Sequence, residues 1–338
     1  MRLSDFDFDL PDALIAQTPA RPPESARLLH APPDGGFGDR TVADLPALLR
    51  PDDVLVVNDT RVIPARLRGR RGDVRIEVTL HAEDGPDLWR AFAKPAKRLR
   101  PGDVVAFDGA LTATVEARDG PEAVLRFDRG GDALAAALDR CGAPPLPPYI
   151  KRPDGATAQD QADYQTMFAA QSGSVAAATA GLHFTPALLA RCEAAGAAVA
   201  RITLHVGAGT FLPVTAEDPR DHVMHAERWR VDAAAAGVIA KARAVGGRVI
   251  AVGSTALRTL EQSMGREGAG ETRLFITPGQ PIRMVDAMLT NFHLPKSTLF
   301  MLVAAFIGLD RAQAAYAHAI AKGYRFFSYG DATFLERP

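Results

Sequence analysis

Polar residues whose side chains could take part in catalysis or binding directly follow apolar runs in the sequence. Asn-Asp-Thr-Arg at residues 58–61 follows the apolar run 54–57. At the end of a buried strand, such a segment can present the carboxylate of Asp59 and the guanidinium of Arg61 to one ligand. A capped turn closed by an Asp–Arg pair is at least as common. The residues alone leave both interpretations open.

His183 stands just before Thr185-Pro186, a pair that is typical of a helix N-cap followed by the first helical position. The N-terminus of a helix favours anions, and an imidazole there can titrate near the operating pH. A lone histidine is more often structural. His183 is therefore a candidate for proton transfer, with a structural role as the alternative.

The segment His222-Val-Met-His225-Ala-Glu227 could suggest a metal site. A helical zinc pair would place two histidines four residues apart with a glutamate between them, and this spacing does neither. The segment fits a hydrogen-bonded acid–base or substrate-binding cluster better. We therefore expect no metal here.

Glycines follow a predicted strand in the run His205-Val206-Gly207-Ala208-Gly209-Thr210-Phe211. The run resembles half of a dinucleotide-binding turn, but Leu212 stands where the third glycine belongs, which excludes that fingerprint. Close approach of the backbone to some ligand remains an option. The patterns G-x-S-x-G, H-E-x-x-H and the P-loop are absent, which disfavours serine hydrolases, zincins and P-loop enzymes.

Polar residues also gather at 290–298, ahead of a very apolar helix predicted at 299–307, and at 328–331. Polar loop residues in front of a buried helix N-terminus commonly bind anionic or polar ligands.

The elements that must position these residues change character along the chain. From residue 66 to 128, apolar and polar residues alternate in short runs separated by glycine turns, which predicts a small antiparallel barrel or sandwich. A helix is predicted at 132–140, and the proline-rich connector 144–148 suits a domain boundary.

After residue 151, strands, glycine or hydroxyl turns and helices alternate, which predicts an α/β sheet covered by helices. The simplest arrangement is a discontinuous α/β domain (1–65 and 151–338) with an inserted β-barrel (66–150). The predicted strands are 199–206, 248–252, 273–276 and 324–328. The predicted helices run from Pro186 to Gly196, from Ala256 to Ser263, from 299 to 307 and from Asp310 to near Gly323.

Composition restricts the class of protein. The 338 residues are 47% hydrophobic and 23% charged with a formal net charge of -1, which excludes a wholly basic nucleic-acid binder. Two cysteines without C-x-x-C spacing favour a reducing compartment. An acidic N-terminus and an apolar run (298–309) that is too short to cross a bilayer lead us to expect a cytoplasmic protein without a membrane span.

The charge is nevertheless uneven. Residues 61–100 contain 11 Lys/Arg against 5 Asp/Glu. Such a cluster can hold a polyanion with salt-dependent affinity, or it can be an ordinary solvated barrel surface. Eight of these 11 are taken as the basic cluster, with Lys151 and Arg152 just past the connector: Arg66, Arg68, Arg70, Arg71, Lys94, Lys97, Arg98 and Arg100.

Taken together, these motifs resemble the S-adenosylmethionine:tRNA ribosyltransferase-isomerase family of queuosine biosynthesis. The resemblance covers residues 1 to about 335. The stretches that carry it, in order, are 58–66, 94–99, 146–150, 164–166, 179–185, 205–211, 286–302 and 324–331.

The resemblance implies a large α/β domain interrupted by a small β-barrel, in agreement with the pattern above. It also implies a reaction in which S-adenosylmethionine donates its ribosyl group to 7-aminomethyl-7-deazaguanine at the wobble position of tRNA. The products are epoxyqueuosine-tRNA, adenine and methionine. S-adenosylmethionine is then a consumed co-substrate, no cofactor or metal is expected, and we expect a monomer.

The roles implied for individual residues are hypotheses. Asp59 or Glu227 acts as the base, Arg61 orients it or binds the methionine carboxylate, and His183 and His225 move protons at adenine or at the amine. The donor site is formed by His205, Gly207, Gly209, Ser254, Thr255, Asn291 and His293, with Phe211 and Tyr329 as cation–π partners of the sulfonium. The tRNA is bound by Arg66, Arg68, Lys94, Lys97, Arg98, Lys151 and Arg152.

Two other functions compete with this one. A non-catalytic RNA-binding protein would account for the basic cluster but not for the polar strand ends of the α/β half. A metal hydrolase built on His222, His225 and Glu227 would require stoichiometric zinc.

Overall fold

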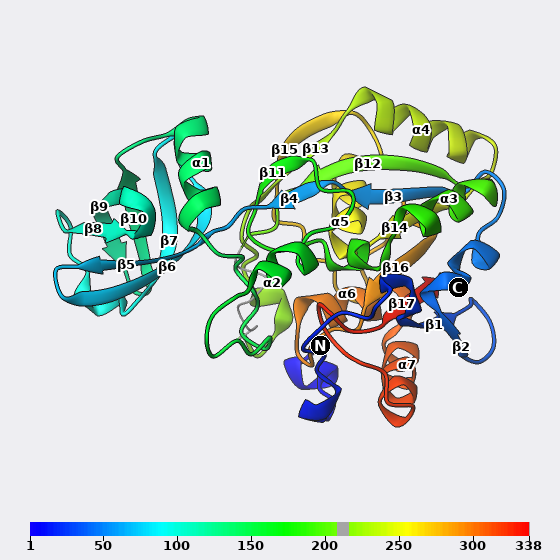
Figure 1. The fold of residues 1–338 in the computed structure, drawn as a ribbon. Coiled ribbons are helices and arrows are strands. Elements are labelled where there is room, and N and C mark those ends of the chain that lie inside the picture. The colour runs from blue at the N-terminus through cyan, green and yellow to red at the C-terminus, as the bar shows by residue number, and fades with distance from the viewer. Residues whose placement is uncertain (208–215, 338) are drawn as a thin grey trace.

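The computed structural model describes residues 1–207 and 216–337, in two parts that lie side by side (Figure 1). The smaller part is a closed antiparallel barrel with the strand order β10-β7-β6-β5-β8-β9. Every second side chain faces inward, and Leu67, Ile76, Val78 and Leu80 are fully or almost fully buried. The barrel strands are β5 (Arg66–Arg71), β6 (Val74–Glu83), β7 (Leu88–Lys94), β8 (Val104–Phe107), β9 (Leu111–Asp119) and β10 (Glu122–Phe127).

The helix predicted at 132–140 is confirmed as α1 (Gly131–Cys141). Its apolar face buries Leu134, Ala137 and Leu138 against the barrel core. The barrel is therefore a separate hydrophobic core, packed by its own helix.

The larger part is built on a nine-stranded mixed sheet with the order β15-β13-β12-β3-β14-β16-β17-β1-β2. Strands β12, β3, β14 and β16 are parallel, so their carboxyl ends meet at one edge. The strands are β1 (Arg27–Ala31), β2 (Gly38–Thr41), β3 (Val54–Asn58), β12 (Ala198–Leu204), β13 (Glu227–Val231), β14 (Val249–Val252), β15 (Gly268–Thr272), β16 (Ala287–Asn291) and β17 (Ala332–Glu336).

Helices cover both faces of this sheet. α4 (Ala233–Ala244), α5 (Ser254–Ser263), α6 (Thr298–Ile307) and α7 (Leu309–Ala321) bury one face. α3 (Pro186–Ala194) and the 3-10 helix η4 (Val42–Leu48) pack on the other. The α/β fold class with an inserted antiparallel barrel is thus confirmed, whereas the boundaries at residues 65 and 150 stay a prediction.

Shorter elements connect these layers. β4 (Thr60–Val62) pairs in parallel with β11 (Gln171–Ser174), and α2 (Ala158–Asp163) follows the proline-rich connector. The short 3-10 helices are η1 (Leu3–Phe6), η2 (Asp12–Leu14), η3 (Pro23–Ser25), η5 (Ala96–Arg98), η6 (Asp108–Ala110), η7 (Thr179–His183) and η9 (Pro219–Asp221).

Two predicted strands are wrong. Residues 273–276 follow β15 but form no strand, because the amide of Leu274 turns back to the Thr272 hydroxyl at 3.0 Å. Residues 324–328 form only an isolated bridge, between Phe326 and Ile15, because Phe327 has a positive φ of 73° that breaks the extended backbone. The last strand begins later, at Ala332, so the polar residues 328–331 precede it.

The chain enters and leaves the barrel at one crossing point. Arg66 and Ala143 exchange two backbone hydrogen bonds of 3.0 and 2.8 Å. Beside them, a Cβ atom on Gly142 would lie 2.0 Å from the carbonyl oxygen of Pro64, so only glycine fits. The two connections are therefore held together by backbone contact (Figure 1).

We predict that Gly142→Ala lowers the free energy of unfolding by about 1–3 kcal/mol, because the crossing must move apart to admit a methyl group. Gly237→Ala is the matched control, since nothing lies within 4 Å of a Cβ atom at that helical position. The control should be neutral or stabilising by about 0.5–1 kcal/mol. Urea unfolding of both variants measures the difference, and equal stabilities would contradict the prediction.

Candidate active site

A cavity of about 430 Å³ opens at the carboxyl edge of the parallel strands. In open α/β sheets this edge is where ligands bind. Val206 after β12, Gly253 and Ser254 after β14, and Asn291 at the end of β16 all contribute to its wall. The remaining wall comes from Ala176–Ala180, residues 292–299, and the pairs Pro148-Tyr149 and Phe327-Ser328, with Tyr164.

The side-chain amide of Asn291 is held from three sides. Its Nδ2 lies 3.1 Å from the carbonyl oxygen of Phe327, 3.4 Å from that of Ser328 and 3.3 Å from Nε2 of His183. The Oδ1 atom is buried and has no hydrogen-bond partner among the described residues. Asn291 itself is 1% exposed and lines the cavity.

His183 lies behind this amide and does not line the cavity. Burial lowers its pKa to about 4, an effect opposed by the charge of Asp331 and reinforced by that of Arg325. The imidazole is therefore neutral at neutral pH. A neutral ring can accept a hydrogen bond from the Asn291 amide at Nε2.

The hydroxyl residues of the predicted donor site gather at the N-terminus of α5. Gly253 has a φ of 93° there. A Cβ atom at this position would lie 3.4 Å from the Cβ atom of Ala180, so the helix begins in contact with the cavity wall. Ser254 and Thr255 line the cavity, and Oγ1 of Thr255 is buried with no partner in the described parts of the chain. A helix N-terminus favours an anionic ligand group.

His293 also lines the cavity and is neutral. Its Nε2 lies 3.1 Å from the Thr290 hydroxyl, and its backbone amide donates to the Tyr316 hydroxyl at 3.0 Å. Complete burial lowers the pKa of His293 to about 3. Ser254, Thr255, Asn291 and His293 are thus brought together, as expected for one binding site.

Other predicted donor-site residues lie elsewhere. Gly207 follows the lining residue Val206, whereas Gly209 and Phe211 lie outside the described residues. His205 does not line the cavity; its Nδ1 lies 2.8 Å from the Thr60 hydroxyl, and burial, with the charge of Arg228, lowers its pKa to about 4. The roles of these residues stay predictions.

The two candidate bases and Tyr329 are buried near this edge but are not part of the cavity wall. Asp59 follows β3 and accepts a 2.7 Å hydrogen bond from Thr203; burial raises its pKa, which that hydrogen bond partly offsets. Glu227 forms a buried ion pair with Arg258 and accepts a hydrogen bond from the backbone amide of Gly207 at 3.3 Å. Tyr329 packs edge-on against Tyr164.

Arg61 and His225 are exposed. Within residues 1–207 and 216–337, no group of three or more His, Cys, Asp or Glu side chains is arranged to hold a metal ion. No observation tests the predicted roles of these residues or the proton transfer predicted for His183, and all of them remain predictions.

Sequence reasoning missed several residues of the site. The hydroxyls of Tyr149 and Ser328 lie 2.7 Å apart at the cavity wall, and burial raises the pKa of Tyr149 to about 12. The stretches 146–150 and 164–166 carry a signal, since both belong to the motifs of the resemblance, but the motifs imply no role for Tyr149 or Tyr164. Arg258 had no signal, because its partner Glu227 is 31 positions away.

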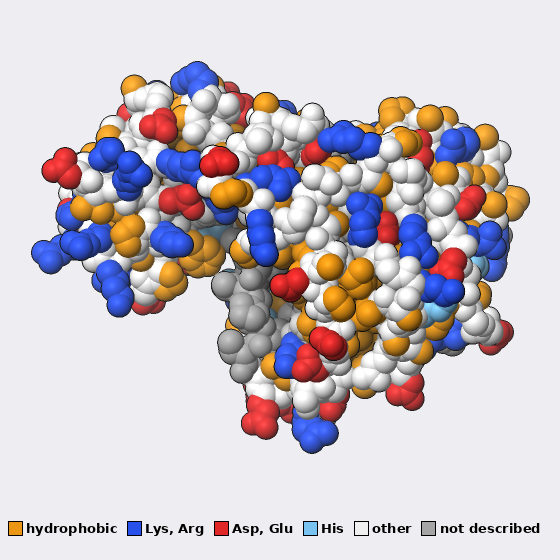
Figure 2. All heavy atoms as spheres, turned by 60° about the horizontal axis from the view of Figure 1, so that its bottom comes forward, with side chains coloured by type: hydrophobic (Ala, Val, Ile, Leu, Met, Phe, Trp, Pro, Cys, Tyr) orange, Lys and Arg blue, Asp and Glu red, His pale blue; other side chains and the backbone are white. Residues whose placement is uncertain are grey.

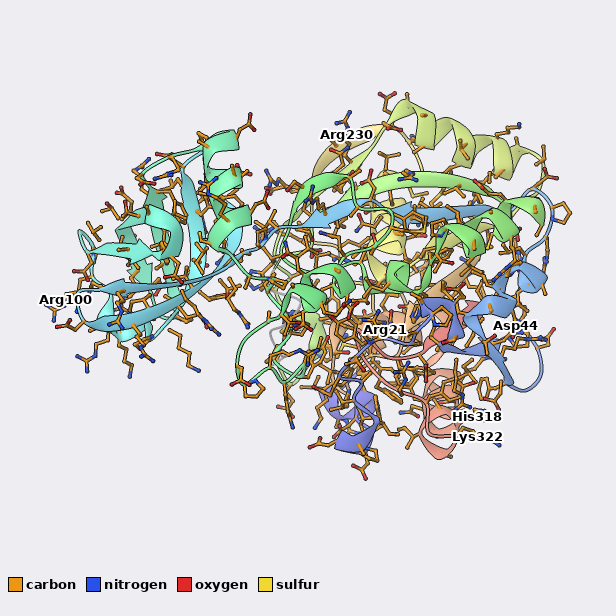
Figure 3. All side chains as sticks on the ribbon, viewed as in Figure 1. Arg21, Asp44, Arg100, Arg230, His318 and Lys322 are labelled. Atoms are coloured by element: carbon orange, nitrogen blue, oxygen red, sulfur yellow. The ribbon has the colours of Figure 1, made fainter. Side chains whose placement is uncertain are left out.

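The basic residues of the barrel form a second feature. Figure 2 shows Lys and Arg side chains gathered over the barrel, and a groove of about 720 Å³ is lined by Arg68, Arg70, Arg75 and Lys94, with the acidic Glu77 and Asp108. Lys97 and Arg98 are exposed on η5, whereas Arg66 is half-buried and donates to the Leu146 carbonyl at 3.3 Å. Arg100 marks the end of the barrel farthest from the sheet (Figure 3).

Lys151 and Arg152 differ although they are neighbours. Lys151 is exposed, but Arg152 forms hydrogen bonds of 2.7–3.0 Å with both carboxylate oxygens of the buried Asp160 and donates to the Gln17 carbonyl at 2.9 Å. This bidentate ion pair fixes the connector to the large part. Arg152 therefore has a structural partner of its own.

No single helix in the described ranges is long and apolar enough to cross a membrane. Among the residues searched, the pair α6 and α7 meets that test together, and the two helices are bent by 114° at the break between them.

Comparison with known proteins places the chain in a family. The model of the family described as queuosine biosynthesis protein matches residues 3–335. The chain belongs to this family. It is 59% identical to the S-adenosylmethionine:tRNA ribosyltransferase-isomerase of Rhodospirillum rubrum, over 99% of this chain and 98% of that protein. It is 55% identical to the protein of that name from Acidiphilium cryptum, over the full length of both.

A solved structure supports the same family. The crystal structure of the S-adenosylmethionine tRNA ribosyltransferase from Thermotoga maritima is similar with a TM-score of 0.56 and 32% identity. The similarity covers 98% of this chain and all of that chain. The queuosine biosynthesis family thus accounts for both the sheet and the barrel.

Arg152→Ala should reduce stability, because it leaves the carboxylate of Asp160 buried without its partner. We expect a loss of about 1–3 kcal/mol at pH 7. The hydrogen bond from Arg152 holds the pKa of Asp160 below 3.8, so this contribution is present above that pH and is lost as the pH falls through the folded-state pKa. Urea unfolding at pH 7 and pH 3 measures it.

Lys151→Ala is the control for this measurement, since it removes the neighbouring exposed cation. An equal loss in both variants, or a loss from Arg152→Ala that persists unchanged at pH 3, would contradict the structural role of the pair.

Proposed function

We propose that the chain transfers and isomerises the ribosyl group of S-adenosylmethionine onto 7-aminomethyl-7-deazaguanine at the wobble position of tRNA. The products are epoxyqueuosine-tRNA, adenine and methionine. The observation that carries this proposal is the cavity at the carboxyl edge, whose wall combines buried polar atoms without partners and a helix N-terminus in a chain of the queuosine biosynthesis family.

The cavity fits a donor of this kind. Its volume of about 430 Å³ lies within the range of small-molecule sites, and apolar residues such as Ala177, Phe292 and Leu299 make up much of the wall. The first turn of α5, with Ser254 and Thr255, can accept the methionine carboxylate. Apolar surface remains for the adenine and ribose rings.

The chemistry requires proton transfers rather than methyl transfer. The sulfonium acidifies the C5′ hydrogens of the ribose and later leaves as a neutral thioether. A base must remove one C5′ proton, an acid must assist the departure of adenine, and the acceptor amine must be unprotonated. Each proton transfer is typically worth about 10²–10⁴-fold in rate.

Asp59 and Glu227 remain the proposed alternatives for the base. Asp59 lies at the carboxyl edge next to the cavity strands, and the raised pKa that burial gives it suits a proton acceptor. Glu227 adjoins Gly207, one residue beyond the cavity wall, but its ion pair with Arg258 already engages its charge.

The direct test incubates the protein with labelled S-adenosylmethionine and tRNA that carries the precursor base. We expect free adenine, methionine and the modified nucleoside in equal amounts. Methylated RNA would reject the proposed ribosyl transfer.

The same assay tests the base. Replacing the true base, by Asp59→Asn or by Glu227→Gln, should slow adenine release by about 10²–10⁴-fold and leave tRNA retention unchanged. Near-normal turnover in both variants would reject both residues as the base.

The barrel is proposed as the face that binds the tRNA. Its groove is lined by Arg68, Arg70, Arg75 and Lys94, and Lys97 and Arg98 are exposed a few residues beyond Lys94, so the barrel offers several cations to a phosphate backbone. Lys97 and Arg98 have no ion-pair partner within 4.0 Å among the residues described, so their charges are available to a ligand.

Lys97→Ala combined with Arg98→Ala should weaken tRNA binding and reduce the slope of log K against log salt by about two, one for each lost phosphate contact. The matched control combines Lys322→Ala with Lys241→Ala, two exposed cations on the large part, of which Lys322 follows α7 and Lys241 lies on α4 (Figure 1). Filter binding at several salt concentrations measures both. An unchanged slope in the barrel variant would place the tRNA elsewhere.

Three further properties belong to the same proposal. S-adenosylmethionine is consumed as a co-substrate, and the reaction as written calls for no metal. Because tRNA is the acceptor, the protein acts in the cytoplasm. One chain carries both the cavity and the barrel, so a monomer suffices.

A further inference from the structure

We propose that His183 is a positioning residue, which fixes the Asn291 amide so that its Oδ1 is a permanent hydrogen-bond acceptor for a substrate in the cavity. The ligand group is an N–H or O–H donor. It comes either from S-adenosylmethionine or from the precursor base of the tRNA. The identity of these ligands rests on the proposed function, whereas the orientation of the amide rests on geometry alone.

The orientation of the Asn291 amide follows from its neighbours. Two of the atoms that contact Nδ2 are the carbonyl oxygens of Phe327 and Ser328, at 3.1 and 3.4 Å, and carbonyls only accept hydrogen bonds. Turning the amide over would place Oδ1 against both carbonyl oxygens and lose these bonds. The amino group must therefore face the carbonyls, which leaves Oδ1 on the other side.

His183 completes this arrangement as an acceptor. Its Nε2 lies 3.3 Å from Nδ2, so its lone pair faces an N–H group and its proton resides on Nδ1. A proton on Nε2 would set two donors against each other. His183 therefore holds the amide in place and cannot deliver a proton from Nε2 to a substrate while the amide keeps this orientation.

The remaining oxygen is unsatisfied. Oδ1 of Asn291 is buried without a partner in the described chain, and the same holds for Oγ1 of Thr255, which also belongs to the cavity wall. A buried polar atom left without a hydrogen bond typically costs about 1–3 kcal/mol. Two such atoms in the wall of one cavity are accounted for when a ligand supplies their partners.

The test compares two replacements of His183. Glutamine can place its Oε1 near the position of Nε2 and accept the bond from Asn291, whereas leucine cannot. We expect His183→Leu and Asn291→Ala to weaken binding of the donor-bearing ligand by about tenfold. His183→Gln should bind within about twofold of wild type, and its pH profile of adenine release should keep the wild-type shape.

The two possible sources of the donor are separated by measuring binding twice. Calorimetry with S-adenosylmethionine alone gives one arm, and retention of precursor-bearing tRNA without S-adenosylmethionine gives the other. The arm in which Asn291→Ala and His183→Leu both lose affinity identifies the source. Unchanged affinity of both variants in both arms overturns the proposal.

The matched control is His318→Gln, a replacement of the same kind on α7, where the ring contacts Asp39 at 3.1 Å (Figure 3). It should bind both ligands as wild type does. If His183→Gln loses as much affinity or activity as His183→Leu, or abolishes one limb of the pH profile, His183 carries a proton and the proposal fails.

The tautomer of His183 can also be measured directly in the wild-type protein, so this test does not depend on the folding of a variant. Nitrogen NMR of histidine-labelled protein should show His183 as the neutral tautomer protonated on Nδ1 between pH 6 and 8. An imidazolium, or a proton on Nε2, overturns the proposal. If the wild-type protein binds neither ligand, the proposed function is rejected. The tautomer of His183 would still show whether its Nε2 accepts a hydrogen bond from the Asn291 amide.

Discussion

The carboxyl edge of the sheet depends on the side-chain amide of Asn58. β3 is buried along its whole length between β12 and β14. Where it ends, the Asn58 amide donates to the carbonyl of Leu204 and accepts from its amide, both at 3.0 Å, and also accepts from Thr60 at 3.1 Å. The side chain thus continues the pairing with β12 while the main chain turns away toward β4 and the barrel. One buried amide therefore sets both the edge that carries the cavity and the direction of the chain toward the barrel.

A second constraint is the tight turn that supports Asn291. Phe327 has a positive φ, which costs a non-glycine residue about 1–3 kcal/mol unless its surroundings hold it. The Asp331 carboxylate accepts from the backbone of Arg325 at 2.8 Å, and Gly330 has no room for a Cβ atom, which would lie 2.5 Å from the Phe326 backbone. The turn is thus fixed from both ends. Its two carbonyls are the ones that orient the Asn291 amide, so the proposed recognition of a ligand by Asn291 would depend on this strained turn.

The sequence predicts those parts of the molecule that local rules govern. The barrel follows from period-two alternation, and α3 follows from the Thr185-Pro186 cap, whose hydroxyl does accept from the amide of Leu188. The strand predicted at 273–276 is wrong, whereas Gly-Ala-Gly-Glu-Thr at 268–272, which lacks an apolar alternation, forms β15 by pairing with β13. Which residues line the cavity depends on tertiary contacts that local rules do not predict. Asp59 and Asn291 both follow apolar runs, yet of the two only Asn291 lines the cavity. Likewise, Lys151 and Arg152 each add one positive charge to the sequence, but of these two Arg152 alone forms an ion pair with Asp160.

The charge of the cavity bears on how a sulfonium would react there. Of the described residues in its wall, none is a carboxylate, His293 is neutral, and the hydroxyl of Tyr149 keeps its proton because its pKa is raised. Lys296 is exposed and forms an ion pair with Asp7 at 2.6 Å. A cation in such surroundings loses its hydration without gaining a full counter-charge. A neutral thioether loses little hydration free energy when it is buried. In the proposed reaction, the cavity would therefore favour the steps that discharge the sulfur, and the buried acceptor of Asn291 would hold the substrate by a hydrogen bond rather than by an opposite charge.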